Sequence, residues 1–485
     1  MSEGSAPWHA AYDPEAFRRL GHQAVDDLAD YLGRALSGEA MPVLGAASFG
    51  AVEAAFQPEA GAGHERGFWR DLLQHAHHLH HPGYIGHQVA PIVPAAALVE
   101  MVSTMLNNGM AIWEMGPANT ACEKRMVQIL AQQVGWSSGA DGVLTHGGSL
   151  GNLTALLAAR QARAQGDAWS DGQTRPGTFL ASAQNHYSID RAVRIMGMGA
   201  QGVTQVACDR RHRLDPADLP RALEAARAAG REVLGVVACA GTTATGSFDP
   251  LPAIADFCEA HGLWLHVDGA HGASFLLDAG LRSRLAGIER ADSVVWDLHK
   301  MMLAPPLITA VLFRDGAHSH GTFVQKASYL FSEGEPCSPD IGRRTVECTK
   351  RALGATAYFL WQTLGPEFLA GYMRSMVQLA QDFAADIQAH EQFELAVEPE
   401  ANIVCFRRRF AGALERQNAL QAELRRRTVA RGDFYLVQTK LDETLYLRTT
   451  LIHPGTDRLR LRRLLEELAR EPVESTPAPD ATTCG

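Results

Sequence analysis

The chain has little of several residue types, and each shortage excludes a class of protein. Its 485 residues include only 8 cysteines, with no C-x-x-C pair, so we predict neither a disulfide framework nor a zinc knuckle. Positive charge is in the minority, because 44 Lys and Arg stand against 54 Asp and Glu. The net charge of −10 argues against a broad nucleic-acid surface and against an anionic-membrane binder.

Long uninterrupted hydrophobic runs are also missing. The most apolar stretch, residues 89–106, contains Pro91, Pro94 and Glu100, which suit a buried segment of a globular fold better than a lipid-exposed span. Residues 1–17 have no basic segment followed by an apolar run, so we expect no secretory signal and a cytoplasmic protein. The length and the 46% of hydrophobic residues predict two or three compact units with ample core.

Between residues 142 and 314, short apolar runs alternate with helical patterns. The predicted strands are 142–145, 178–181, 203–208, 233–240, 264–269, 293–296 and 308–314. This alternation predicts an α/β fold with a mostly parallel seven-stranded sheet and helices on both faces. Ligands of such sheets usually bind at the carboxyl ends of the strands.

The rest of the chain divides around this sheet. We expect an N-terminal helical segment at 1–75, beginning at Asp13-Pro14, and a large α/β domain at 76–360. A small α+β domain at 361–471 follows, and the tail at 472–485, rich in Pro, Ser and Thr, is expected to be disordered. The histidine-rich run at 75–81 has no Cys or carboxylate cluster spaced to complete a metal site, so we predict no metal.

Two charged residues follow adjacent predicted strands. Asp268 comes directly after the strand residues 264–267 and is followed by small residues, which let a flat ligand approach the backbone. A buried Asp needs a partner that favours its charged form, and a protonated ring nitrogen is one such partner. A helix-capping role is the plain alternative for this residue. Lys300 follows the strand at 293–296 and precedes Met301 and Met302, a setting that suits a desolvated amine able to form a Schiff base.

Two further segments would suit a phosphate-bearing aldehyde. The sequence His146-Gly-Gly-Ser149 joins a strand to a helix, so its glycines permit close approach while Ser149 and the first helical N–H groups can bind an anion. His186 follows the strand at 178–181 and could stack on an aromatic ligand at the same sheet edge. Each signal is weak by itself, and their combination carries the prediction.

Taken together, these motifs resemble the group II amino-acid decarboxylases that depend on pyridoxal phosphate. That family includes glutamate, cysteine sulfinate, aromatic amino acid and diaminobutyrate decarboxylases. The matching motifs include HPGYIGHQ at 81–88, WEMGP at 113–117, HGGSLGNL at 146–153, NHYS at 185–188, CAGTTATGSFDP at 239–250, HVDGAHG at 266–272, DLHKMM at 297–302, SYLF at 328–331 and YLRTTLIHP at 446–454. The resemblance implies the type I fold of pyridoxal phosphate enzymes, and a homodimer with active sites at the subunit boundary.

The resemblance also implies a role for each candidate residue. Lys300 would bind the cofactor aldehyde as a Schiff base, and Asp268 would pair with the pyridine nitrogen. His186 would stack on the ring, while Gly148 and Ser149 would hold the phosphate. Further positions would line the cofactor (Thr243, Ala270, His299) or the substrate (Tyr84, His87, Gln88).

Two more residues would act on the substrate itself. Arg448 matches the family arginine that takes the α-carboxylate. Tyr329, on a loop expected to be mobile from about 318 to 339, matches the tyrosine that protonates Cα, with His186 as a rival donor. The predicted reaction is the loss of CO₂ from an L-amino acid, with short acidic substrates (aspartate, glutamate, cysteine sulfinate) favoured.

Other functions stay open at this point. Diaminobutyrate or an aromatic amino acid is an alternative substrate, and an aminotransferase or another lyase could use the same fold. The chain also departs from the family in two places. Asp297 stands where relatives often carry Asn, and Ile85-Gly86-His87-Gln88 replaces the Asn-Gln of glutamate-like members.

Overall fold

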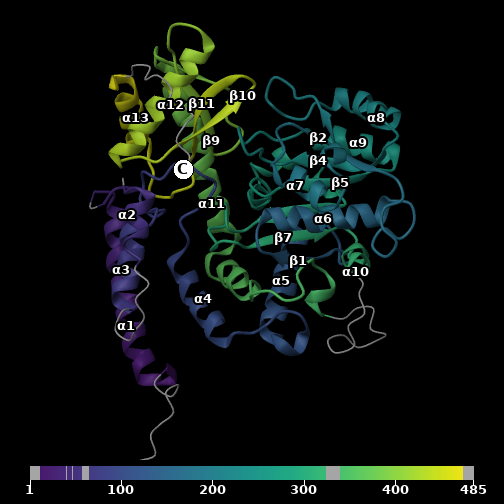
Figure 1. Cartoon of the computed structure of the whole chain (residues 1–485), viewed down its shortest axis with the longest axis horizontal. Coiled ribbons are helices and arrows are strands. Elements are labelled where there is room, and N and C mark those ends of the chain that lie inside the picture. Colours follow the sequence, from purple (N-terminus) through teal and green to yellow (C-terminus); the bar gives the residue numbers. More distant parts are fainter. Residues whose placement is uncertain (1–10, 40, 46, 57–64, 324–338, 473–485) are drawn as a thin grey trace, which may run out of the picture.

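The computed structural model of the chain describes residues 11–39, 41–45, 47–56, 65–323 and 339–472 (Figure 1). Its centre is a seven-stranded sheet with the order β1-β7-β6-β5-β4-β2-β3. The strands are β1 (Asp141–Thr145), β2 (Gly177–Ser182), β3 (Val203–Val206), β4 (Glu232–Cys239), β5 (Trp264–Asp268), β6 (Ser293–Asp297) and β7 (Thr309–Phe313). Strands β2 to β6 pair in parallel, and β7 runs antiparallel to β1 and β6. The predicted mostly parallel α/β sheet is confirmed.

Helices cover both faces of this sheet because its buried strands are apolar on both sides. On one face, α6 (Gly148–Arg163) packs across β4 to β7 and against α7 (Ser188–Ile195). On the other face lie α5 (Pro117–Val134), α8 (Leu219–Ala228) and α9 (Leu251–His261). Neighbouring strand residues accordingly belong to different cores: Val236 packs with the second group of helices and Val237 with the first.

A smaller unit follows the large sheet. The long α11 (Gly354–Ala389) is broken at Gly365, whose φ of 73° lies in the left-handed region, and at Pro366. Beyond it, an antiparallel sheet has the order β10-β11-β9-β8 and packs with α12 (Leu414–Arg431) and α13 (Arg458–Arg470). Its strands are β8 (Phe393–Leu395), β9 (Ile403–Arg408), β10 (Val437–Leu441) and β11 (Thr444–Thr450). The sequence predicted the last two strands and did not predict β8 and β9.

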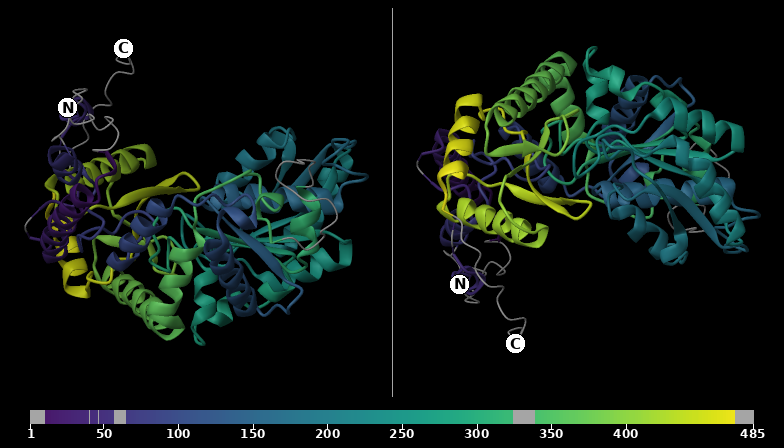
Figure 2. Two further views of the ribbon diagram at one scale, coloured as in Figure 1. Left: turned by 90° about the horizontal axis from the view of Figure 1, so that it is seen from below. Right: turned by 90° about the horizontal axis from the view of Figure 1, so that it is seen from above.

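The N-terminal helices lie beside the C-terminal unit, away from the large sheet (Figure 2). Helix α1 (Pro14–Ser37) begins where the sequence predicts, since the Asp13 side chain accepts a hydrogen bond from the Glu15 N–H and caps it. Two shorter helices, α2 (Phe49–Glu53) and α3 (Glu65–His75), follow.

The apolar stretch at 89–106 is not fully buried, so that expectation was wrong for the single chain. Its helix α4 (Pro94–Leu106) exposes Leu98, Met101, Val102, Met105 and Leu106, each by 46–61%. The cause is that α4 is apolar around most of its circumference but packs against the fold on one side only, chiefly on α11. Among the described residues, no helix combines the length and the apolar character that crossing a bilayer requires.

Candidate active site

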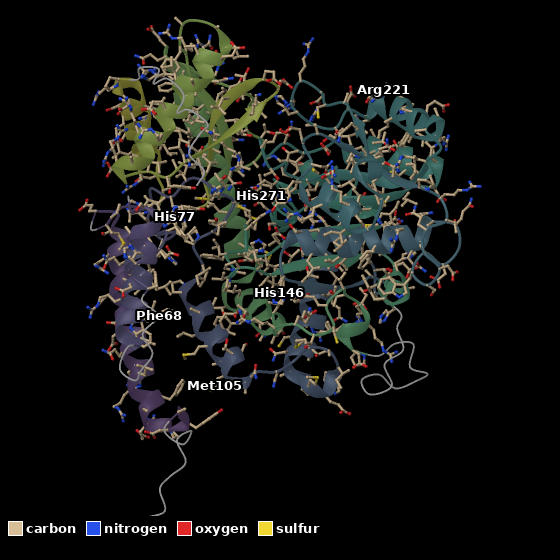
Figure 3. All side chains as sticks on the ribbon, viewed as in Figure 1. Phe68, His77, Met105, His146, Arg221 and His271 are labelled. Carbon is tan, nitrogen blue, oxygen red and sulfur yellow. The ribbon has the colours of Figure 1, made fainter. Side chains whose placement is uncertain are left out.

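A cavity of about 410 Å³ opens where β4, β5 and β6 end. Its lining includes these sequence-predicted residues: Gln88, Gly148, Ser149, His186, Thr243, Asp268, Ala270, His299 and Lys300. His146 and His271 also line it, and Figure 3 labels both in the central part of the molecule. The fold therefore brings together side chains that are far apart in the sequence. Gln88 and Lys300, for example, are 212 positions apart.

Asp268 is the last residue of β5 and is only 6% exposed. One carboxylate oxygen accepts a hydrogen bond from the Asn152 side-chain amide at 2.9 Å, and the other accepts from the Ala270 N–H at 3.1 Å. The Asn152 carbonyl oxygen lies 3.0 Å from Nε2 of His266, which fixes the direction of that amide. Both donors to Asp268 are neutral, so the carboxylate keeps lone pairs for a cationic partner that would enter the cavity.

His186 presents a neutral ring to the same cavity. Its Nδ1 accepts a hydrogen bond from the Ser188 N–H at 3.3 Å and lies 2.9 Å from the Ser188 hydroxyl. This contact places the ring proton on Nε2. Burial lowers the pKa of His186, and the nearby charge of Asp268 opposes that effect only in part. A neutral, planar imidazole in this position suits contact with an aromatic ligand.

Lys300 lies in the turn after β6 and has a partner that the sequence analysis did not identify. Its Nζ is 3.0 Å from Oδ2 of Asp297, the last residue of β6. Burial disfavours the charged carboxylate of Asp297, but the charges of Lys300 and His299 outweigh burial and hold its pKa below the usual value. The expected desolvated amine is therefore a half-buried ammonium paired with a buried carboxylate.

The turn between β1 and α6 leaves room for an anion. Gly147 has a φ of 90°, and a Cβ on it would meet the Leu307 side chain at 3.1 Å. A Cβ on Gly148 would lie 3.2 Å from both carboxylate oxygens of Asp297. Ser149 follows in the first turn of α6, where backbone N–H groups have no helical partner. The two glycines thus keep open a cradle that side chains would fill.

Arg448, on β11 of the small sheet, is 5% exposed and extends toward the loop that follows β4 of the large sheet. It donates from Nε to the Ala244 carbonyl at 3.0 Å and from Nη1 to the Gly86 carbonyl at 3.3 Å. Its buried Nη2 has no hydrogen-bond partner among the described residues. An unsatisfied buried guanidinium nitrogen is costly, so this atom is a strong donor for an incoming carboxylate.

The other predicted substrate residues gather near Arg448. The ring of Tyr84 stacks on that of Tyr435 with 4° between the ring planes, and Nε2 of His87 lies 3.0 Å from the Tyr435 hydroxyl. Of this predicted group only Gln88 lines the 410 Å³ cavity, while Tyr84, His87 and Arg448 lie outside its lining. Tyr435 was missed, because a single aromatic residue in a predicted strand gives no functional signal.

Two residues in the cavity wall were also missed by the sequence analysis. Asn152 orients Asp268, and His271 is buried with Nε2 at 2.6 Å from Oδ1 of Asn402. Burial, reinforced by the charge of Lys300, lowers the pKa of His271 to about 3, so its ring is neutral. Their positions within HGGSLGNL and HVDGAHG were the available signal. Tyr329 lies outside the described residues. The first residues of the predicted loop are not a loop, because α10 (Ala317–Thr322) includes them.

Comparison with known proteins decides among the families that could use this arrangement. The family described as "Pyridoxal-dependent decarboxylase conserved domain" matches residues 70–409. The chain belongs to the pyridoxal-dependent decarboxylase family. It is 35% identical over 344 residues to cysteine sulfinic acid decarboxylase of Homo sapiens, covering 70% of this chain and 69% of that protein. It is 31% identical over 407 residues to L-2,4-diaminobutyrate decarboxylase of Rhizobium meliloti (strain 1021), covering 83% and 81%.

Solved structures agree with this family. The crystal structure of mouse CSAD superposes with a TM-score of 0.87 at 28% identity, covering 94% of this chain and 98% of that chain. Oryza sativa TDC with PLP and tryptamine superposes with a TM-score of 0.85 at 25% identity, covering 94% and 97%. The type I fold and the cofactor expected from the sequence are confirmed: the chain is a pyridoxal phosphate-dependent amino-acid decarboxylase.

The cavity fits this cofactor on the evidence of its own side chains. Within the described residues, the Asp268 carboxylate accepts hydrogen bonds from neutral groups, which suits a protonated pyridine nitrogen. The open cradle at Gly147 and Gly148 suits a phosphate, and Lys300 supplies an amine in the same cavity. Among the described residues, no cluster of three His, Cys, Asp or Glu side chains could hold a metal ion.

Proposed function

We propose that this decarboxylase removes the α-carboxylate of a short acidic L-amino acid and releases CO₂ and the amine. Pyridoxal phosphate, when bound, supplies an electron sink for the electron pair that departing CO₂ leaves at Cα. The observation that carries the proposal is the buried Nη2 of Arg448, which has no hydrogen-bond partner within the described part of the chain. The roles of individual residues below are part of the same proposal.

Eight residues would hold the cofactor. Lys300 binds its aldehyde carbon, and the Asp268 carboxylate keeps its ring nitrogen protonated, so that the ring stays electron-poor. His186 would contact the ring, and Gly148 with Ser149 would bind the phosphate through N–H and O–H donors. Thr243, Ala270 and His299 complete the wall, which is supported by their place in the cavity lining.

Arg448 would hold the substrate α-carboxylate. Its guanidinium is fixed by the Ala244 and Gly86 carbonyls, so little side-chain freedom is lost when Nη2 binds the carboxylate. A fixed carboxylate would determine which Cα bond is broken, because it would fix the orientation of that bond relative to the bound cofactor. The neutral ring of His186 and the Tyr329 hydroxyl are the two candidate donors of the proton that replaces CO₂ at Cα.

The electrostatics near His87 favour an acidic substrate side chain. The pKa of His87 lies below its usual value, first because the ring is partly shielded from solvent and further because Arg448 and Arg425 are close. Two guanidinium groups around one imidazole make this region attractive to an anion and repulsive to an ammonium group. The relative of Mus musculus named "Acidic amino acid decarboxylase GADL1", 32% identical over 341 residues, supports the same substrate class.

A panel of amino acids tests the substrate. Purified protein with pyridoxal phosphate is given aspartate, glutamate, cysteine sulfinate, 2,4-diaminobutyrate and tryptophan, and CO₂ and amine are measured. We expect one of the three acids to have the highest kcat/KM. The diaminobutyrate decarboxylase relative makes diaminobutyrate the second candidate, and a preference for it or for tryptophan would overturn the acidic assignment.

The cofactor lysine is tested separately. Borohydride reduction of the loaded enzyme followed by peptide mapping should label Lys300. A label on any other lysine would sink the site assignment, whatever the substrate is.

We further propose a homodimer, acting on its substrate without nucleic-acid or membrane partners. Exposed apolar side chains recur on α1 (Phe17, Leu28), α3 (Phe68) and α4, and Figure 3 labels Phe68 and Met105 on this side of the molecule. A second copy is the occupant that the family resemblance supports, and a contact of this kind buries such residues between chains. Sedimentation should give a dimer, and a fully active monomer would refute it. The cytoplasmic location expected from the sequence stays a proposal.

A further inference from the structure

Asp297 makes three polar contacts at the wall of the 410 Å³ cavity. It is 2% exposed, and its Oδ1 accepts a hydrogen bond from the Thr309 hydroxyl on the paired strand β7 at 2.5 Å. Its Oδ2 lies 3.0 Å from Nζ of Lys300 and 3.6 Å from Nε2 of His299. The carboxylate is thus held rigidly, with one oxygen committed to a neutral donor and the other to a cation.

The same carboxylate faces the start of α6. Both of its oxygens lie 3.2 Å from the position of a Cβ on Gly148, the first residue of that helix. Gly147, Gly148, Ser149 and Asp297 all line one cavity. The cradle proposed above for the phosphate therefore includes a negative charge in its wall, which an anion-binding site built only from N–H and O–H donors would not have.

A phosphate monoester in this cradle meets that charge. Its second pKa is about 6, so it is a dianion at neutral pH. Two anions in direct contact repel each other, and a single proton shared between their oxygens turns the repulsion into a short charge-assisted hydrogen bond. Coupled acids of this kind bind one proton as a pair rather than as separate groups.

We propose that Asp297 is a positioning residue that makes cofactor uptake proton-linked: the phosphate enters with one proton, shared between a phosphate oxygen and the Asp297 carboxylate. This inference rests on the proposed location of the phosphate at Gly148 and Ser149. This proton comes from solvent, so each site takes up one proton from solvent when the phosphate binds. Lys300 keeps its ammonium proton during this step. The second consequence is that Lys300 remains protonated beside Asp297 while the phosphate binds, and it releases that proton to solvent only when its amine reacts.

Other titratable groups face Asp297 and have to be separated from it. They are His299 and Lys300 after β6, Asp268 at the end of β5, His271 after β5, His186 after β2 and His146 after β1. His271 and His186 both have lowered pKa values because burial favours their neutral forms. An acid preference caused by His299 would persist when Asp297 becomes Asn, whereas one caused by Asp297 would disappear.

The test uses the full chain freed of cofactor and the probe 4-deoxypyridoxine 5′-phosphate, which has the phosphate but no aldehyde. Isothermal titration from pH 6 to pH 9, in buffers of different ionisation enthalpy, gives Kd and the number of protons taken up. We expect the Kd of the unaltered protein to rise by about tenfold per pH unit above pH 7, relative to Asp297→Asn, with close to one extra proton taken up. At pH 8, Asp297→Asn should bind the probe at least tenfold more tightly than the unaltered protein.

A matched variant separates charge from packing. Thr309→Val removes the hydrogen bond to Asp297 but keeps the carboxylate, so it should keep the pH slope of the unaltered protein. Equal slopes and equal proton uptake for the unaltered protein and Asp297→Asn would overturn the inference. If borohydride mapping still labels Lys300 in that case, the inference fails alone. A label elsewhere means that the proposed cofactor site itself has failed.

Discussion

Two carboxylates end neighbouring parallel strands of the large sheet, and they are satisfied in opposite ways. Asp268, at the end of β5, receives hydrogen bonds from a side-chain amide and a backbone N–H, both neutral. Asp297, at the end of β6, is paired with the ammonium of Lys300. Both side chains are buried and both line one cavity, so the difference lies in their partners rather than in their place in the fold.

The two carboxylates differ in the charge of their partners: Asp268 has neutral donors, and Asp297 has a cation. A buried carboxylate with neutral donors gains most when a positive group enters, because only then is its charge balanced. A carboxylate that is already paired gains nothing from a second cation and repels an entering anion. Asp268 is therefore suited to hold a cationic ligand atom, and Asp297 is suited to hold the lysine and to regulate the entry of an anion.

The largest effect is expected from Asp268→Ala. Breaking a buried charge pair costs about 3–5 kcal/mol, which corresponds to a fall in kcat of about 10² to 10⁴. Cofactor binding should weaken as well, while a helix-capping role would instead give a stability loss of ~1 kcal/mol with activity intact. Turnover, the visible absorbance of the loaded enzyme and the melting temperature are compared. Near-normal turnover would assign Asp268 to capping.

A smaller effect is expected from Asn152→Ala, which removes one of the two donors to Asp268. Hydrogen bonds to charged groups contribute about 1.5–3 kcal/mol, so kcat should fall by about 10 to 100-fold. The loss should act through Asp268, so adding Asn152→Ala to Asp268→Ala should cost little more. Additive losses in that double variant would show that Asn152 works independently of Asp268.

The sequence alone predicted the large sheet well because its signals are local. Each buried strand is a short apolar run, and each run is bounded by a helical pattern or a turn, so all seven strands fall close to the predicted positions. In the small unit, β8 has three residues and pairs only with β9, which leaves too short a pattern to detect. The exposed face of α4 was also missed, since the sequence of α4 is apolar whether or not a partner covers it.

The candidate site shows the same limit in chemical terms. Strand-end residues such as Asp268 and Lys300 could be found, because the end of a parallel strand places them at the ligand edge. The partners of these residues could not, since the distance between Asp297 and Lys300 or between Asn152 and Asp268 depends on side-chain geometry. The substrate side was hardest, because Arg448 and Tyr435 reach it from a different sheet.

The smallest effect is expected from Asp297→Asn, and it is measured as a change in the stability of the folded chain. The pKa of Asp297 is lower in the folded chain than its usual value, because Lys300 and His299 favour the charged carboxylate. A carboxyl group of this kind contributes stability that is present above its unfolded pKa of about 3.9 and is lost as the pH falls through the folded pKa. Asp297→Asn should therefore lower the melting temperature of the cofactor-free protein by about 1–2 °C at pH 7.

That difference should shrink as the pH falls below 4, because a protonated Asp and an Asn present the same neutral shape to Lys300. Thr309→Val is the matched control, since it removes a neutral hydrogen bond to the same carboxylate and should lower the melting temperature by an amount that changes less with pH. Scanning calorimetry of the three proteins between pH 3.5 and pH 7 measures both trends. A deficit for Asp297→Asn that is equally large at both ends of that range would mean that Asp297 matters for packing. The charge contrast with Asp268 would then have no thermodynamic basis.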